Sequence, residues 1–208
     1  MKSLDYKIIA TGSKGNFVRI EDIGIDCGIS FKRMKEELYK CRSLFITHAH
    51  SDHLKPETLA MIRKEFPRIR VYANSDVAYR VPVDKVLGSK PITLKRSKVQ
   101  VFPIEGVHDV PVTELLFKFP DGTTVFYATD TAEARNPTGD KIDYCFLESN
   151  FDEKKLKELS KHYKRKGYDP MDSSARHLST QKCKAFFYAN RRSKDSKLIE
   201  LHMSERFY

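Results

Sequence analysis

The sequence has little of what marks a secreted, disulfide-bonded or membrane-spanning protein. Cysteine occurs four times in 208 residues and never as a Cys-x-x-Cys pair. That scarcity argues against a disulfide framework and against a cysteine-rich zinc knuckle. No apolar run approaches the roughly 18 residues of a membrane span, and the first residues lack an apolar stretch of signal-peptide length. These absences predict a cytoplasmic protein that does not insert into a membrane.

Internal repeats, low-complexity tracts and linkers rich in proline, glycine and serine are also missing. A chain of 208 residues, 40% of them hydrophobic, is long enough to close a sizeable core. We therefore expect one domain over residues 1–208.

Basic residues outnumber acidic ones by 38 to 28, which gives a formal net charge of +10. The segment 154–197 carries 14 basic and 4 acidic residues, so its net charge equals that of the whole chain. Aromatic residues lie among these charges, at Tyr163, Tyr168, Phe186, Phe187 and Tyr188. Such a segment could follow a nucleic-acid backbone and stack its bases, or it could be a solvated helix face whose aromatic residues belong to the core.

Short apolar runs typical of strands alternate with stretches of helical periodicity. The expected strands are 17–20, 23–26, 44–47, 69–73, 99–103, 115–119, 124–129, 144–148 and 198–202. The expected helices cover about 31–38, 56–66, 153–165 and 179–191, the last with Ser179 or Thr180 as N-cap. Asp121-Gly122 between two apolar runs predicts a hairpin turn. The whole pattern predicts a layered α/β fold.

The segment 48–53 concentrates candidate ligands. Three histidines and one aspartate follow directly after the expected strand 44–47: His48, His50, Asp52 and His53. Imidazole and carboxylate groups suit a borderline divalent ion such as zinc. The strand end can direct His48 and His50 to one ion, and the turn after it can direct the other two side chains to a second. Two ions about 3.5–4 Å apart form a common hydrolytic clamp.

The string His-x-His-x-Asp-His resembles the signature of the metallo-β-lactamase superfamily. The resemblance implies an α/β fold in the form of a four-layered αββα sandwich, with two divalent metal ions and further ligands on later strand ends. His108, Asp130 and His202 each lie at or just after the end of an expected strand. By this resemblance one ion is held by His48, His50 and His108, the other by Asp52, His53 and His202, and Asp130 bridges them. Zinc and manganese both suit these donors.

Shorter motifs resemble a narrower branch of the superfamily, the YycJ/WalJ-type proteins. They are Thr-Gly-Ser-Lys-Gly-Asn at 11–16, Gly-Ile-Asp-Cys-Gly-Ile-Ser-Phe-Lys at 24–32, Leu-Glu-Ser-Asn at 147–150 and Arg-His-Leu-Ser at 176–179. This likeness spans about residues 9 to 204 and implies metal-dependent nuclease activity on DNA, including 5′-to-3′ exonuclease action. Phe151 stands where the branch often has histidine and Arg176 where it usually has glycine, which leaves the choice of substrate open.

The branch motifs imply substrate binding by Ser13, Asn16, His177 and Ser179. Hydrolysis would use a hydroxide that the two ions activate, with Asp52 orienting it. His177 is the candidate for protonating the leaving oxygen or binding the phosphate; its alternative role is to cap or pack against the helix that follows. Asp26 is expected to buttress a ligand histidine, and Glu148 could do the same.

The sequence therefore predicts a metal-dependent phosphodiesterase that hydrolyses nucleic acid, and the leading hypothesis is a DNA exonuclease. One alternative is a small-molecule hydrolase of the same fold that acts on a thioester, a lactone or a cyclic nucleotide. Another is a non-catalytic nucleic-acid-binding module. A homodimer is a further option, in which a second subunit would brace His202 near the end of the chain.

Overall fold

The structure is a computed structural model that describes residues 3–163, 171 and 174–204. The chain forms two compact units, Met1–Lys90 and Pro91–Tyr208. Each unit contains a six-stranded sheet. That the whole chain acts as one domain stays a prediction.

The first unit begins with antiparallel strands and continues with parallel strands joined by helices. Its elements are β1 (Tyr6–Ala10), β2 (Phe17–Ile20), β3 (Ile23–Ile25), α1 (Phe31–Leu38), β4 (Ser43–Ile46), α2 (Pro56–Glu65), β5 (Arg70–Ala73), α3 (Ser75–Arg80) and β6 (Lys85–Val86). The sheet order is β1-β2-β3-β4-β5-β6, and the strands from β3 to β6 are parallel. The carboxyl ends of β3 and β4 therefore meet at one edge of this sheet.

Helices α1 and α2 bury their apolar faces in the core of the first unit. Met34 and Leu38 of α1, and Leu59 and Ile62 of α2, belong to one cluster with buried residues of β4 and β5. Their spacing of three or four residues places each pair on one face of its helix. Pro56 opens α2 at a position where its missing N–H leaves no helical hydrogen bond unmade.

The second unit follows an antiparallel meander with two parallel crossovers. Its elements are β7 (Ile92–Thr93), β8 (Gln100–Glu105), β9 (Thr113–Lys118), β10 (Thr124–Ala128), β11 (Tyr144–Glu148), α4 (Glu153–Tyr163), α6 (Thr180–Asn190) and β12 (Lys197–Leu201). The sheet order is β12-β11-β10-β9-β8-β7, with β10, β11 and β12 parallel. The carboxyl ends of these three parallel strands share one edge.

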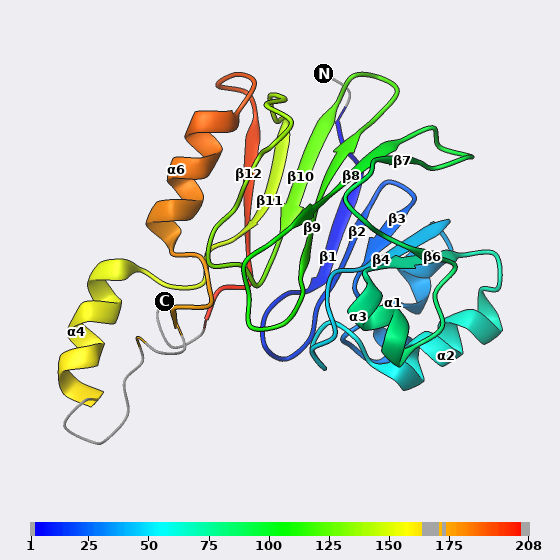
Figure 1. Ribbon diagram of the computed structural model, residues 1–208, viewed down its shortest axis with the longest axis horizontal. Helices are drawn as coiled ribbons and strands as arrows, with labels where there is room; N and C mark the ends of the chain where they lie inside the picture. Colours follow the sequence, from blue (N-terminus) through cyan, green and yellow to red (C-terminus); the bar gives the residue numbers. More distant parts are fainter. Residues whose placement is uncertain (1–2, 164–170, 172–173, 205–208) are drawn as a thin grey trace. The chain divides into compact units, whose positions relative to one another are not determined.

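Helix α6 covers part of the second sheet. Its buried residues Cys183 and Phe187 pack with Cys145 and Leu147 of β11. Figure 1 shows α6 running beside β12 and β11, while α4 extends away from this sheet. The Ser179 hydroxyl accepts a hydrogen bond from the Lys182 N–H, so the predicted N-cap is confirmed.

Most expected elements are confirmed within two residues at each end. Segments 17–20 and 144–148 coincide with β2 and β11, and the hairpin turn between β9 and β10 has Gly122 at a φ of 86°. The sequence patterns missed β1, whose side chains are half-buried or exposed, and the six-residue helix α3. The two-residue strands β6 and β7 were missed too. None of these has enough buried apolar residues to show a period.

Among the residues described, no helix combines the length and apolar character needed to cross a bilayer. All four cysteines are buried free thiols. Burial raises the pKa of the Cys27 and Cys41 thiols to about 12. Thiols of that kind are not ready metal ligands at neutral pH, so the candidate metal ligands are imidazole and carboxylate groups.

Candidate metal centre

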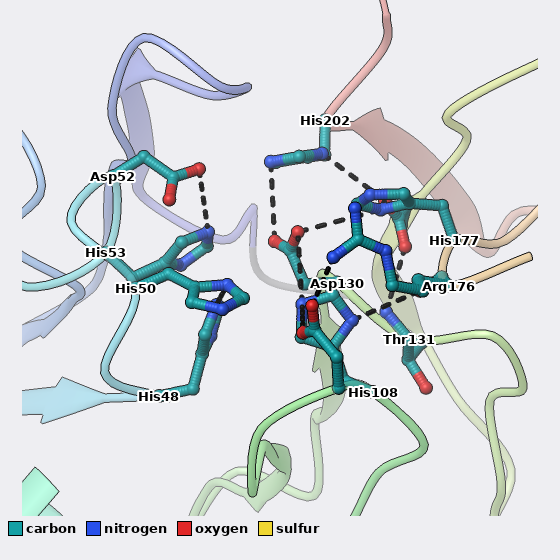
Figure 2. A network of polar contacts seen from close by, with 12 residues as sticks. His48, His50, Asp52, His53, His108, Asp130, Thr131, Arg176, His177 and His202 are labelled. Atoms are coloured by element: carbon teal, nitrogen blue, oxygen red, sulfur yellow. Dashed lines mark hydrogen bonds and ion pairs between the residues drawn. The ribbon is translucent and has the colours of Figure 1, made fainter. Parts of the chain in front are cut away.

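The candidate ligands of the first unit lie in the loop between β4 and α2, just past the carboxyl end of β4. His48 and His53 are fully buried. His48 Nε2 lies 3.2 Å from His50 Nδ1, and Asp52 Oδ2 lies 3.5 Å from His53 Nε2. Figure 2 shows these side chains gathered at one loop. The centroids of the His48 and His53 rings are 4.0 Å apart, so the loop forms a compact donor group.

The buried carboxylate of Asp26 orients His53. Because β3 and β4 are parallel neighbours, Asp26 after β3 lies beside Thr47 after β4. Asp26 Oδ1 accepts hydrogen bonds from the Thr47 N–H and hydroxyl at 2.8 and 2.9 Å. Asp26 Oδ2 lies 2.7 Å from His53 Nδ1. A carboxylate only accepts, so the proton sits on Nδ1 and the lone pair lies on Nε2, which is the tautomer that can bind a metal ion through Nε2. The prediction that Asp26 buttresses a candidate ligand histidine is confirmed.

Two further residues fix the loop that carries Asp52. The buried Asn16 side chain donates to the Asp52 carbonyl oxygen at 3.1 Å and accepts from the Gly12 N–H at 2.8 Å. Its Nδ2 also lies 2.8 Å from His53 Nε2. A Cβ atom on Gly28 would stand 1.6 Å from the Asp52 carbonyl oxygen, so only glycine fits there. The glycine and asparagine of the motifs at 11–16 and 24–32 therefore have packing roles beside the ligand loop.

The candidate ligands of the second unit follow its parallel strands. Asp130 lies just beyond β10, Glu148 ends β11 and His202 follows β12. His202 Nε2 lies 3.3 Å from Asp130 Oδ2, and His202 Nδ1 lies 3.3 Å from Glu148 Oε1. Asn150 Nδ2 donates to the His202 carbonyl oxygen at 2.9 Å. Asp130 and His202 both have a φ near 50°, which turns the chain sharply at the strand ends.

His177 joins this group through Glu148. Its Nδ1 lies 2.7 Å from Glu148 Oε1 and 3.6 Å from Asp130 Oδ1. Burial lowers the pKa of His177, but the hydrogen bond and charge of Glu148, with the charge of Asp130, more than offset it and leave that pKa raised. Burial raises the pKa of Glu148, but its hydrogen bonds to His177 and His202 outweigh this effect and hold that pKa below the usual value. The structure therefore favours a protonated His177 beside an ionised Glu148.

His108 lies at the rim of the same group, in the loop between β8 and β9. Its Nε2 is 3.0 Å from Asp109 Oδ1 and 3.9 Å from Asp130 Oδ1, and its Nδ1 is 3.2 Å from the Arg176 carbonyl oxygen. The Arg176 guanidinium forms an ion pair with Asp109. Burial lowers the pKa of His108 more than the charges of Asp130 and Asp109 raise it. A neutral imidazole is the form that binds a metal ion.

The donor spacing within each unit fits a divalent ion. Zinc–nitrogen bonds of about 2.0–2.1 Å at tetrahedral angles place two ligand atoms about 3.3 Å apart. The pairs His48–His50, Asp52–His53 and Asp130–His202 have separations of 3.2, 3.5 and 3.3 Å. In the second unit, Asp130, Glu148, His177 and His202 each offer an atom within 4.8 Å of the others. Nitrogen and oxygen donors of this kind suit zinc and manganese.

The residues expected to bind substrate lie in different surroundings. Ser13 is exposed, Asn16 is buried in the loop network, and Ser179 caps α6 while its hydroxyl donates to Glu153 at 2.6 Å. His177 is partly buried beside Glu148. Substrate contacts by these four residues stay predictions. Tyr168 of the basic segment lies outside the described residues, whereas Phe187 is buried in the core and Tyr188 is exposed.

Sequence reasoning missed two polar contacts of these groups. The Thr47 hydroxyl lies 3.0 Å from His48 Nδ1 as well as against Asp26. Asp109 contacts both His108 and Arg176. The available signals were Thr47 directly before His48 and Asp109 directly after His108. Such neighbours commonly supply the second hydrogen bond of a metal-binding histidine.

Comparisons with known proteins agree with this fold. The family model described as "Beta-lactamase superfamily domain" matches residues 22–180. No curated protein sequence matches the chain. Similar solved structures include the metallo-beta-lactamase fold protein YhfI from Bacillus subtilis, with 14% identity, a TM-score of 0.68 and coverage of 97% of this chain and 86% of that chain.

Human tRNase Z, short form, is 17% identical with a TM-score of 0.67, over 97% of this chain and 93% of that one. A diphosphatase from the PhnP family is 15% identical with a TM-score of 0.67, over 97% and 88%. At such identities the likeness shows the fold and not the activity. The predicted fold class is thereby confirmed, and because the family model covers most of the chain, this protein belongs to the beta-lactamase superfamily, with the metallo-β-lactamase fold.

Proposed function

We propose that the protein is a hydrolase dependent on divalent metal ions, and that it is a phosphodiesterase acting on nucleic acid, with DNA exonuclease action of the YycJ/WalJ type as its specific form. The observation that carries the proposal is the pair of donor groups at the ends of parallel strands. Their atoms have ligand spacing, and Asp26 and Glu148 buttress their histidines.

The ligand assignment follows the sequence resemblance. One ion would be held by His48, His50 and His108, a second by Asp52, His53 and His202, with Asp130 shared. Divalent ions held by these residues would neutralise the charge of a phosphate and would lower the pKa of a bound water molecule. Zinc and manganese are the candidates.

Two side chains carry the remaining chemistry. The Asp52 carboxylate, partly exposed at the loop, accepts a hydrogen bond from the attacking water and orients it for in-line attack. His177 is held through Nδ1 by Glu148, and its raised pKa keeps a proton available at Nε2. That proton can pass to the leaving oxygen as the phosphodiester bond breaks.

The charge of the chain supports a polyanionic substrate. Helix α4 exposes Lys154, Lys155 and Lys157, and α6 exposes Lys182 and Lys184. Exposed basic side chains on two helices of one unit attract a phosphate backbone in a salt-dependent way. The similarity to human tRNase Z and to a diphosphatase of the PhnP family is compatible with phosphate-ester chemistry. The buried free cysteines fit the predicted reducing cytoplasm.

The test is hydrolysis of bis-p-nitrophenyl phosphate by protein loaded with zinc or manganese, followed by end-labelled single- and double-stranded DNA and RNA. We expect diester turnover that chelation abolishes, and DNA shortened progressively from an end. D52A should abolish cleavage, whereas the control D121A, in the hairpin turn, should keep it.

Metal-loaded protein that cleaves only thioesters or lactones would favour the small-molecule hydrolase, and binding of DNA without any turnover would favour the non-catalytic module. Either result contradicts the proposed function. Light scattering on the same preparation tests whether the protein forms the homodimer that the sequence left as an option.

A further inference from the structure

We propose that Arg176 is a substrate-binding residue that recognises the phosphate group, and that its guanidinium exchanges the Asp109 carboxylate for a non-bridging phosphate oxygen when substrate binds. The proposal rests on the proposed function and names the substrate class, phosphate-ester anions, that the second unit selects.

Arg176 lies beside candidate ligands of the second unit. It directly precedes His177, and its carbonyl oxygen lies 3.2 Å from His108 Nδ1. Asp109, its ion-pair partner, lies 3.0 Å from His108 Nε2. Figure 2 shows the Arg176 side chain alongside His108, His177 and Asp130. The guanidinium therefore belongs to the polar group that holds the candidate ligands of the second unit.

The fold of the unit does not require the Arg176 side chain. The contact with His108 comes from the main-chain carbonyl, which any residue supplies. The side chain is 46% exposed and Asp109 is 34% exposed, and ion pairs at such exposure contribute little to stability. Among the residues that the structure describes, Asp109 engages one of its five N–H donors, at Nη1.

A phosphate oxygen can replace the Asp109 carboxylate at the guanidinium without a change in the type of contact. Carboxylate and phosphate oxygens both match the planar fork of arginine, which favours the charged, bidentate pair. A phosphodiester brings one negative charge to replace that of Asp109 at the guanidinium. The reacting group of a lactone or a thioester is uncharged, so that group does not displace Asp109. Arg176 thus discriminates between phosphate esters and neutral esters.

The experiment compares the R176Q, R176K and wild-type proteins, each loaded with the same metal. We expect the KM for bis-p-nitrophenyl phosphate to rise about 10- to 100-fold in R176Q with little change in kcat, as for the loss of one charge-assisted pair. R176K keeps the positive charge but loses the planar guanidinium, so its KM should lie between those of R176Q and wild type. Hydrolysis of neutral p-nitrophenyl acetate should not change.

The matched control is R192Q. The Arg192 side chain is also 46% exposed and is paired with an aspartate, Asp143. Asp143 lies just before β11, at the opposite end of that strand from Glu148. Its loss should leave the KM for the diester unchanged. A second readout, independent of turnover, is calorimetric binding of thymidine 5′-monophosphate, which should weaken about tenfold or more in R176Q and not in R192Q.

Equal KM and equal nucleotide affinity in R176Q and wild type would overturn the proposal, as would a fall in kcat with KM unchanged. If the wild-type protein hydrolyses no diester, the proposed function fails. The affinity for thymidine 5′-monophosphate alone then tests whether Arg176 binds phosphate. Weakening confined to R176Q supports phosphate recognition, and unchanged affinity refutes it.

Discussion

Replacing Asp26 by asparagine should strongly lower the affinity for the metal ion, although the two side chains have the same shape. Asp26 Oδ1 accepts from the Thr47 N–H at 2.8 Å, so an amide must place its oxygen there. The amide NH2 then faces His53 Nδ1, at the position 2.7 Å away that Oδ2 now occupies. Two donors cannot face each other, so Nδ1 becomes the acceptor. The proton then sits on Nε2, where it blocks the atom proposed to bind the ion and also opposes the Asn16 amide nitrogen 2.8 Å away.

The magnitude follows from the bond that is lost. A charge-assisted hydrogen bond to a buried carboxylate contributes about 1.5–3 kcal/mol, and Asp26 is fully buried. That range corresponds to about a 10- to 100-fold loss of metal affinity, which matches the usual effect of removing a buttress of a ligand histidine. We expect a loss of this size in zinc affinity, measured at pH 7 by competition with a chromophoric chelator.

The matched control is D143N. Asp143 is buried too and accepts from the Thr124 N–H at 2.8 Å, but its other oxygen pairs with Arg192 and contacts no histidine. D143N should lower stability and leave zinc affinity unchanged. Wild-type zinc affinity in D26N would refute the assignment of Nε2 as the ligand atom of His53.

The remaining predictions concern stability and binding. Burial raises the pKa of Glu114 to about 8 from its usual 4.5. Between these values the folded state keeps a proton that the unfolded state releases, so stability falls as pH rises. The stability gain of E114Q over wild type should therefore grow by about 1.4 kcal/mol per pH unit from pH 5 to 8 in urea unfolding; parallel pH profiles would contradict this. G28A should destabilise the protein by about 3 kcal/mol or more, because its Cβ would overlap the Asp52 carbonyl; a normal melting temperature would count against that packing. DNA affinity should fall steeply between 50 and 200 mM salt, and a flat profile would exclude a role for the basic helices.

The strands and ligand loop could be predicted because their signals are local. The apolar run before His48 predicted a buried strand, and β4 confirms it. The dense group after it predicted metal ligands, and the structure shows those histidines close together, with ligation itself staying a prediction. Asp26 and Glu148 as buttresses were foreseeable because Asp26 directly follows β3 and Glu148 ends β11. Such residues meet when parallel strands align their carboxyl ends.

Other features depend on contacts distant in sequence, which no local pattern shows. The Asp109–Arg176 pair joins residues 67 positions apart. Asn16 looked like a substrate residue in its motif, yet its side chain is buried against Asp52 and His53 from another loop. The half-exposed β1 lacks the burial that produces a period. In each case the deciding information is three-dimensional.

The measurement that tests the central claim most directly is anomalous diffraction at the zinc edge from crystals of the zinc-loaded protein. Two peaks per chain are expected, one bound by His48, His50 and His108 and one by Asp52, His53 and His202, with Asp130 contacting both. Diffraction that showed no zinc at these side chains, or zinc bound elsewhere, would contradict the proposed metal centre.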